Sequence, residues 1–484
     1  VYVVQSVVYA RGNRAGARTE EFGLAPGASY TLQWAVYPCS TPDYYEFINR
    51  VRKDEGRQVT VEGGFAFLPR TGVTREHIAI RGVRYGSFGC LSSVADDPEI
   101  EIEGIEFIKL PKERARIREQ FEAIRQVDPD VKLMFHVAHS LWSTNTPSEV
   151  FPDSRVIDAD GTHVIYAYDY GNGAYFSQAR HEAGWRWYIY YPTPGNSFHD
   201  ALLHSVDVMT DEIGCNGAFM DGYMWGYGSR YTYDRWDGHT VKIDPQTKLI
   251  TAKPGSVLLL SQPSMVEYTR KMLDKGAVVI ANGAVMTRTL GSLPIIVDLE
   301  VQEGPGVHLA PTAAALGNPG AIRDEVDVYL DALNKLRWAN LYFYYGEGSI
   351  TYPSLPRAQY PITVERLHEG VIEGKERIIT MRSGVYGWPD DGALHYCHRF
   401  NAAGREVPAG FITTVEPGST RTQVDLGGGE SAVVVRLPAR LQAEGPVNVL
   451  VTRYGADGVE LLCNGNGPAE LLLRTGAFTI EPGA

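Results

Sequence analysis

Residues 214–228 read GCNGAFMDGYMWGYG, and this stretch carries the most informative pattern in the chain. A short apolar run ends abruptly at Asp221 and is followed by glycines and aromatic residues. The run is typical of a strand that is buried on both faces, as in a parallel sheet. An alternative is that Asp221 caps a loop and that the aromatic residues only pack within that loop.

Outward from this stretch, short apolar runs alternate with helical segments from about residue 60 to residue 350. Strands are predicted at 62–67, 132–137, 187–191, 217–221, 277–281, 294–300, 307–310 and 340–345. Helices are predicted at 112–125, 198–213, 262–275 and 325–337. This alternation indicates parallel βα units, and about eight strands predict a (β/α)8 TIM barrel, an α/β fold.

A carboxylate at the C-terminal end of a barrel strand points into the mouth where barrel enzymes act. There Asp221 can attack a sugar ring as a nucleophile and form a covalent ester. The rings of Tyr223 and Trp225 can stack against the apolar C–H faces of a pyranose. The stretch therefore predicts a site for a sugar.

Glycoside cleavage needs a second carboxyl group, and residues 295–303 (IIVDLEVQE) supply candidates. Strand alternation makes Asp298 and Glu300 point the same way. Glu300, nearer the end of the strand, is predicted to be the general acid/base, with Asp298 as the alternative. A different possibility is that Glu300 pairs with a basic residue on the barrel wall.

Further polar side chains follow other predicted strands and fit the rim of a sugar site. The candidates are His136, His139, Tyr191, Asn196, Asn282 and His308. His136 and His139 face opposite ways on an extended strand, so we expect a hydroxyl-binding role for one of them and no metal site. A buried structural histidine fits the pattern equally well, and Asn282-Gly283 is equally a turn.

Long loops are predicted after the second and fourth strands, at about 139–175 and 222–255. Trp236 and Asp237 in the second of these loops can complete a sugar subsite. Their Asp-Gly sequence also fits a simple hairpin turn.

The regions before and after the predicted barrel contain short strand-like patterns. Alternation from Tyr30 to Val36 predicts a strand, and residues 43–54 predict a helix with Asp43 as its N-cap. Short strands at 377–381, 393–397, 432–436, 447–451 and 470–473 predict a β-sandwich. We therefore expect an N-terminal β-domain portion with a linker helix (1–58), a catalytic barrel (59–350) and a C-terminal β-sandwich (351–484).

Composition narrows the function classes. The 484 residues are 44% apolar and carry a net charge of −13, which favours a folded protein with large cores and disfavours nucleic-acid and anionic-membrane binding. The five cysteines are scattered and include no C-x-x-C pair, so neither a zinc ribbon nor a dense disulfide framework is predicted. The chain begins Val-Tyr-Val-Val, which suggests a processed product and a secreted or periplasmic location.

The layout resembles the retaining α-glycosidase superfamily, which includes melibiase-type α-galactosidases, related α-glucosidases and endo-α-N-acetylgalactosaminidases. In the last group the nucleophile strand ends Asp-x-Trp-Gly, and Asp221…Trp225-Gly226 is similar but two residues longer. The resemblance implies that Asp221 is the nucleophile and that a sixth-strand carboxylate, Glu300, is the acid/base. The acid/base of this superfamily is often Asp, which keeps Asp298 open.

These patterns together predict a glycoside hydrolase that acts on an oligosaccharide or polysaccharide by a retaining two-carboxylate mechanism, on an α-linked galactoside- or glucoside-like sugar. No cofactor or metal is required. The alternatives are a β-glycosidase or an inverting glycosidase on the same barrel, and a non-catalytic carbohydrate-binding protein. Retention requires a carboxyl separation of about 5–5.5 Å, and inversion about 6.5–9.5 Å.

Overall fold

The computed structural model describes residues 6–19, 21–31, 33–88, 104–166, 181–223, 230–283, 285, 287–299, 314–317, 322–346, 350–389, 392–416, 418–455 and 458–473. The chain forms two compact units. The first unit comprises Val1–Pro38, Phe67–Val73 and Gly86–Asp298, and the second comprises Cys39–Ala66, Thr74–Tyr85 and Leu299–Ala484. The residues of the candidate site that the structure describes belong to the first unit, and the C-terminal antiparallel sheets belong to the second.

An eight-stranded sheet confirms the predicted (β/α)8 barrel. Its strands follow one another in chain order around the sheet: β4 (Gly64–Phe67), β5 (Val83–Ser87), β6 (Lys132–Val137), β9 (Gly217–Met220), β14 (Val278–Asn282), β15 (Ile296–Leu299), β16 (Ala314–Leu316) and β17 (Leu341–Phe343). A parallel bridge between Ala66 and Tyr344 brings the first strand beside the end of the last. The Tyr344 N–H donates to the Phe65 carbonyl at 2.9 Å, so the sheet closes on itself.

Most barrel strands are largely apolar because both of their faces are buried. Every residue of β9 is buried, and so is nearly every residue of β6. Inside the barrel, the ring of Phe219 lies 5.1 Å from the ring of Phe67 and 5.4 Å from the ring of His136. Since side chains alternate along a strand, Asp221 faces the same interior as Phe219.

Helices follow most barrel strands. The longer ones are α3 (Pro111–Val127), α5 (Ser197–Asp207), α7 (Val257–Asp274) and α9 (Glu325–Arg337), and the short ones are α2 (Arg75–Arg81), η3 (Glu106–Lys109), α8 (Arg288–Gly291) and α10 (Leu355–Ala358). The predicted helix at 325–337 is confirmed, with Asp324 accepting from the N–H groups of Val326 and Asp327 as its cap. The predicted helix at 198–213 ends as α5 at Asp207 and continues as a π-helical turn, η4 (Val208–Ile213).

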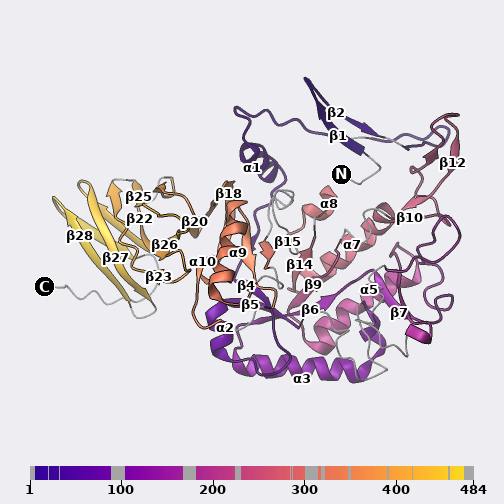
Figure 1. Cartoon of the computed structure of the whole chain (residues 1–484), viewed down its shortest axis with the longest axis horizontal. Coiled ribbons are helices and arrows are strands. Elements are labelled where there is room, and N and C mark those ends of the chain that lie inside the picture. Colours follow the sequence, from indigo (N-terminus) through magenta and orange to yellow (C-terminus); the bar gives the residue numbers. More distant parts are fainter. Residues whose placement is uncertain are drawn as a thin grey trace. The chain divides into compact units, whose positions relative to one another are not determined.

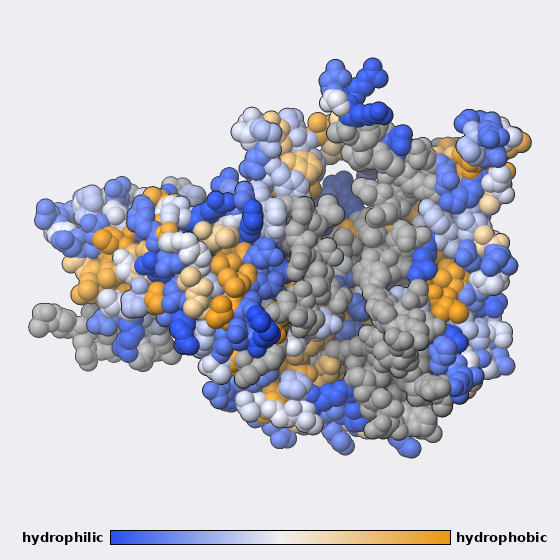
Figure 2. Space-filling view, in the orientation of Figure 1, coloured by the Kyte–Doolittle hydropathy of each residue, from blue (hydrophilic) through white to orange (hydrophobic). Residues whose placement is uncertain are grey.

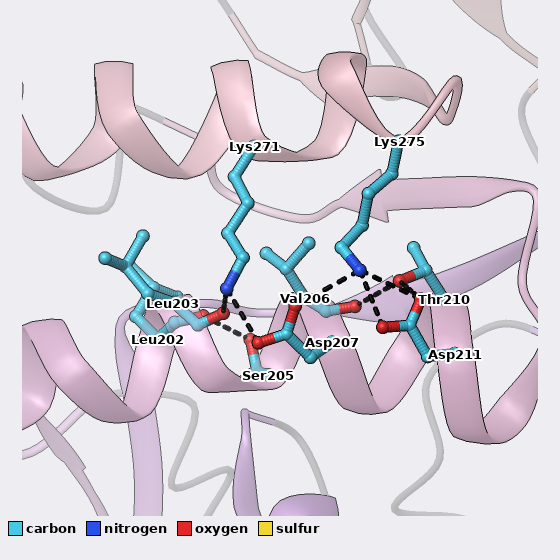
Figure 3. Close-up of polar contacts among 9 residues, drawn as sticks. All are labelled: Leu202, Leu203, Ser205, Val206, Asp207, Thr210, Asp211, Lys271 and Lys275. Carbon is cyan, nitrogen blue, oxygen red and sulfur yellow. Dashed lines mark hydrogen bonds and ion pairs between the residues drawn. The ribbon is translucent and has the colours of Figure 1, made fainter.

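Ion pairs connect α7 and the residue that follows it to α5 and η4, as Figure 3 shows. Lys271 Nζ lies 2.7 Å from Asp207 Oδ2, and Lys275 Nζ lies 2.6 Å from Asp211 Oδ2. Solvent-exposed pairs of this kind add little to the stability of a fold. The ion pairs instead help to position two barrel strands. η4 leads into β9, which Asp221 follows, and α7 leads into β14, which ends at Asn282.

Two expectations about the barrel strands are wrong. The second barrel strand is β5, which the sequence analysis missed, so residues 132–137 form the third strand rather than the second. The predicted strand at 187–191 falls in β8 (Arg186–Ile189), which pairs antiparallel with β7 (Leu141–Thr144) outside the barrel. Periodicity reports that a segment is extended but not which sheet it joins. The predicted strand at 307–310 lies outside the described residues, and the seventh barrel strand is β16.

Two long insertions leave the ends of the neighbouring strands β6 and β9. The first contains the β7–β8 hairpin, and the second contains β10 (Tyr231–Thr232) paired with β13 (Gly255–Ser256) and β11 (Lys242–Ile243) paired with β12 (Ile250–Ala252). They end at α5 and α7. Because β6 and β9 are adjacent in the sheet, both insertions start at the same side of the barrel mouth.

The N-terminal region contains a hairpin, β1 (Ser6–Arg11) with β2 (Arg14–Thr19). The predicted strand from Tyr30 to Val36 is wrong, because the described residues there form no strand and Trp34 is 81% exposed. Alternation alone does not form a strand that has no partner strand. The predicted helix is confirmed as α1 (Tyr44–Asp54), whose first turn is capped by Asp43 accepting from the Tyr45 N–H at 2.9 Å.

Two antiparallel sheets form the predicted C-terminal β-sandwich, which lies at the yellow end of the chain in Figure 1. One sheet contains β3 (Thr60–Val61), β18 (Ile362–His368), β19 (Val371–Gly374), β20 (Arg377–Thr380), β22 (Ala393–Phe400), β23 (Glu406–Val407), β26 (Ser431–Ala443) and β29 (Ala469–Leu473). The other contains β21 (Gly384–Tyr386), β24 (Thr413–Glu416), β25 (Ser419–Val424), β27 (Val447–Gly455) and β28 (Gly458–Gly465). Buried residues of both sheets, such as Leu394 and Val449, share one core.

The surface of the sandwich is mixed in character. Figure 2 shows hydrophobic residues interspersed with hydrophilic ones over this part of the chain, and Ile412 and Leu462 are among the exposed apolar side chains. Single exposed apolar residues are normal on folded proteins. Among the described residues, none of the helices combines the length and the apolar character that crossing a bilayer would require.

Candidate active site

Three neighbouring strands end in polar residues at one level of the barrel. Asp221 directly follows β9, Asn282 is the last residue of β14, and Asp298 lies near the end of β15. The register pairs Ala281 with Met220 and Asn282 with Asp298, so all three polar side chains belong to the same face of the sheet. Asp221 and Asp298 therefore stand on either side of Asn282.

A hydrogen bond orients the Asp221 carboxylate. Asn282 Nδ2 donates to Asp221 Oδ1 at 2.8 Å, and the Asn282 side chain is itself buried. The Asp221 side chain is 23% exposed, so one part of the carboxylate is reachable from outside. Burial raises the pKa of Asp221, and the hydrogen bonds from Asn282 and from the Gly222 N–H only partly oppose this rise.

Main-chain bonds fix the three strand ends against one another. The Asp221 N–H donates to the Val137 carbonyl at 2.9 Å, the Tyr223 N–H donates to the Asn282 carbonyl at 3.1 Å, and the Gly283 N–H donates to the Asp298 carbonyl at 2.9 Å. These bonds continue the strand ladder past the ends of the strands. The functional groups are thus held by the rigid barrel wall rather than by a loop.

The buried imidazole of His136 lies next to Asp221. Its Nε2 lies 3.9 Å from Asp221 Oδ2, and its ring lies 5.8 Å from the ring of Phe67. Burial lowers the pKa of His136 to about 4, so the ring is neutral at neutral pH. The contact with Asp221 is therefore a polar contact and not an ion pair.

His139 and Tyr223 lie deeper, and both are fully buried. The Tyr223 hydroxyl shares a 2.8 Å hydrogen bond with Thr269 Oγ1 of α7, and its ring lies 6.0 Å from the ring of His139. Burial lowers the pKa of His139 to about 3. Both side chains thus support the wall behind Asp221 from the interior of the first unit.

The side chains of Asp237 and Trp236 form hydrogen bonds within their own loop. The Asp237 carboxylate accepts from the N–H groups of His239, Thr240 and Ser256 at 2.7–2.8 Å and from Thr240 Oγ1 at 2.5 Å. The Trp236 indole N–H donates to the Thr240 carbonyl at 2.7 Å. These contacts match the turn interpretation of the Asp-Gly sequence.

Tyr191 and Asn196 lie at the start of α5. Asn196 is the N-cap of this helix, since its Oδ1 accepts from the His199 N–H at 2.9 Å. Its Nδ2 donates to the Tyr191 carbonyl at 2.9 Å, and both residues are buried. The Asn196 amide is thus occupied in organising the loop that precedes the helix.

Three residues of the predicted site, Trp225, Glu300 and His308, lie outside the described residues. Sequence analysis missed Phe67, which ends β4 and lies beside His136 and Phe219. Its signal was its position as the last residue of the predicted strand at 62–67. Within the part of the chain that the structure describes, no three His, Cys, Asp or Glu side chains gather in a way that could hold a metal ion.

The arrangement suits chemistry at Asp221. A carboxylate that is partly reachable, held by one amide and set in a low-polarity wall can act as a nucleophile or a base. Asp298 adds a second buried carboxyl group two strands away, at a Cα separation of about 9.5 Å if neighbouring strands lie about 4.8 Å apart. Two inward-facing carboxyl groups at one barrel mouth form the minimal set for cleaving a glycosidic bond.

No protein-family model and no curated protein matches this chain. Among solved structures, it is similar to a debranching enzyme from Nostoc punctiforme, with 11% identity over 74% of this chain and 87% of that chain and a TM-score of 0.37. It is similar to the α-N-acetylgalactosaminidase NagBb from Bifidobacterium bifidum, with 13% identity, coverage of 71% and 62%, and a TM-score of 0.36. It is also similar to Eubacterium rectale Amy13B, with 8% identity, coverage of 82% and 99%, and a TM-score of 0.33. These TM-scores are too low for the likenesses to carry an argument about this chain.

Proposed function

We propose that the chain is a glycoside hydrolase that cleaves an α-linked, galactoside- or glucoside-like sugar with retention of configuration. The observation that carries this proposal is the Asp221 carboxylate at the end of the fourth barrel strand, oriented by Asn282 and accompanied in register by Asp298. In the reaction, the Asp221 carboxylate attacks the anomeric carbon as the bond to the leaving oxygen breaks. Water then hydrolyses the glycosyl ester.

The second carboxyl group protonates the departing oxygen and afterwards takes a proton from the attacking water. Asp298 and Glu300 are the two candidates for this role. The buried position of Asp298 in the row with Asp221 and Asn282 supports Asp298. The place of Glu300 nearer the predicted end of the strand supports Glu300. His136, Tyr191, Trp225, Trp236 and His308 remain proposed rim residues for the sugar hydroxyls and ring faces, and Asn196 and Asp237 are proposed to shape the loops of this rim.

The test is a panel of aryl α- and β-glycosides of galactose, glucose and N-acetylgalactosamine, with the first product anomer detected by NMR. We expect turnover of an α-glycoside with the α-anomer released first, and no turnover by Asp221→Asn. Release of the opposite anomer would replace the nucleophile by water and make the enzyme inverting. Sugar binding without turnover by the wild-type protein would leave a carbohydrate-binding protein.

Leaving groups of different basicity separate the two acid/base candidates. A leaving group whose phenol has a low pKa departs without protonation, whereas the leaving group of an alkyl glycoside needs a proton from the enzyme. We therefore expect the variant of the true acid/base, Asp298→Asn or Glu300→Gln, to lose far more rate on the alkyl than on the dinitrophenyl glycoside. The other variant should lose similar rates on both substrates.

A further inference from the structure

A pocket of about 320 Å³ lies within the second unit, lined by residues of α10 and of the strands β20, β22 and β27. This volume is at the lower end of the range for small-molecule sites. Four aromatic and four charged or titratable residues line the pocket: Tyr360, Tyr396, Phe400, Tyr454, Arg357, Arg377, His398 and Glu406. None of them belongs to the site of the proposed glycosidase reaction.

The aromatic wall comes from strand alternation. Tyr396, His398 and Phe400 occupy alternate positions of β22, which puts them on one face of the strand. The ring of Tyr454 on β27 lies 6.0 Å from the ring of Tyr396. Aromatic faces of this kind pack against the apolar C–H faces of a sugar ring.

Arg377 is the second, independent feature of the pocket. It is 8% exposed, and its Nη1 donates to the Ala358 carbonyl at 2.6 Å. Among the residues that the structure describes, its Nε has no hydrogen-bond partner, and the neighbouring Glu376 carboxylate attracts the guanidinium without a close ion pair. A buried guanidinium with an unbonded N–H has room for a further acceptor, and its planar fork fits the two oxygens of a carboxylate.

The remaining polar groups lie where a ligand would need them. Arg357 is exposed and adds a second positive charge, although the chain as a whole carries a net charge of −13. Glu406 accepts from His398 Nδ1 at 2.6 Å through one oxygen, which leaves its other oxygen available for hydroxyl groups. The pocket thus combines a cationic end, aromatic sides and a hydroxyl acceptor.

We propose that this pocket binds one acidic sugar residue, a hexuronic acid unit, with its carboxylate on Arg377 and its ring against Tyr396 and Tyr454. The site is non-catalytic and separate from the barrel mouth. It would hold an anionic stretch of a polysaccharide on the second unit. The proposal does not depend on which bond the barrel cleaves.

Titration calorimetry of the whole protein with sodium glucuronate tests the proposal, with glucose and sodium benzoate as comparison ligands. We expect glucuronate to bind at least about tenfold more tightly than either, because glucose lacks the carboxylate and benzoate lacks the hydroxyl groups. Glucuronate binding that is absent, or no tighter than binding of benzoate, would overturn the proposal.

Variants locate the binding. Arg377→Lys keeps the charge but loses the planar fork, and we expect at least about tenfold weaker glucuronate binding. Tyr454→Ala, at a partly exposed residue, should weaken it severalfold even if Arg377→Lys fails to fold. Arg366→Ala, which removes an exposed arginine outside the pocket, is the matched control. Asp221→Asn should bind glucuronate like the wild type, and loss of binding in that variant would assign the ligand to the barrel instead.

Discussion

Asp221 and Asp237 share an Asp-Gly sequence but have opposite surroundings. Each is followed by a glycine with positive φ, 63° at Gly222 and 91° at Gly238, and each has aromatic neighbours. The Asp237 carboxylate accepts four hydrogen bonds, which fills its capacity. Asp221 accepts one from a side chain and one from the backbone and can accept further hydrogen bonds. An Asp-Gly sequence alone therefore does not distinguish a carboxylate that its own loop saturates from one that can still accept a donor.

The sharpest test of this contrast is the same substitution at both positions. Asp221→Asn removes the proposed nucleophile, so we expect kcat on an activated glycoside to fall by about 10⁴-fold or more. Asp237→Asn keeps most of the turn and should change kcat by less than about tenfold. Steady-state kinetics of the two purified variants makes the measurement. Equal losses in both variants would erase the distinction.

The free energy of unfolding should depend more on Asp237 than on an aspartate in an exposed turn. Asp237→Ala leaves three backbone N–H groups without their acceptor, and we expect the free energy of unfolding to fall by about 2–3 kcal/mol. Asp244→Ala is the control, because Asp244 accepts similar turn bonds in an exposed loop where water can replace them. Urea denaturation should therefore show a smaller loss for that variant. A smaller loss for Asp237→Ala than for Asp244→Ala would contradict the structural role.

The pH profile tests the finer point that Asn282 keeps Asp221 ionised. The raised pKa of Asp221 means that activity is lost as pH falls through that pKa, because only the carboxylate can attack. Asn282→Ala removes a bond to the charged form, so we expect the acidic limb of kcat/KM to move upward by about one pH unit. Thr269→Val breaks the bond to the Tyr223 hydroxyl without touching Asp221, and its limb should stay in place.

Local signals were enough to predict several elements. The capping aspartate Asp43 marks the start of α1, the pattern of residues 325–337 predicts α9, and the short C-terminal strands predict the sandwich. The apolar run before Asp221 predicts β9. These signals act over a few residues, within a helix turn or between neighbouring strand positions, so no distant partner is needed to read them.

Other elements could not be predicted because their state depends on distant partners. Strand β5 (VRYGS) contains an arginine and a glycine and lacks an apolar run, yet its place in the barrel makes it a strand. Residues 30–36 alternate well, but those of them that the structure describes form no strand, and Trp34 stays exposed. Burial against other elements outweighs the intrinsic β preference of such segments.

Local sequence properties, strand period and residue type, are enough to predict that a carboxylate ends a buried strand and that acidic residues follow on a later strand. The folded chain is needed to learn that Asn282 donates to Asp221, that Asp298 lies in the same row, and that Asp237 is saturated by its own loop. Hydrogen-bond partners and burial set the pKa and the availability of a carboxylate. For Asp221 these come from distant residues that the closed barrel brings together, and for Asp237 they come from the folded conformation of its loop, to which Ser256 adds one donor.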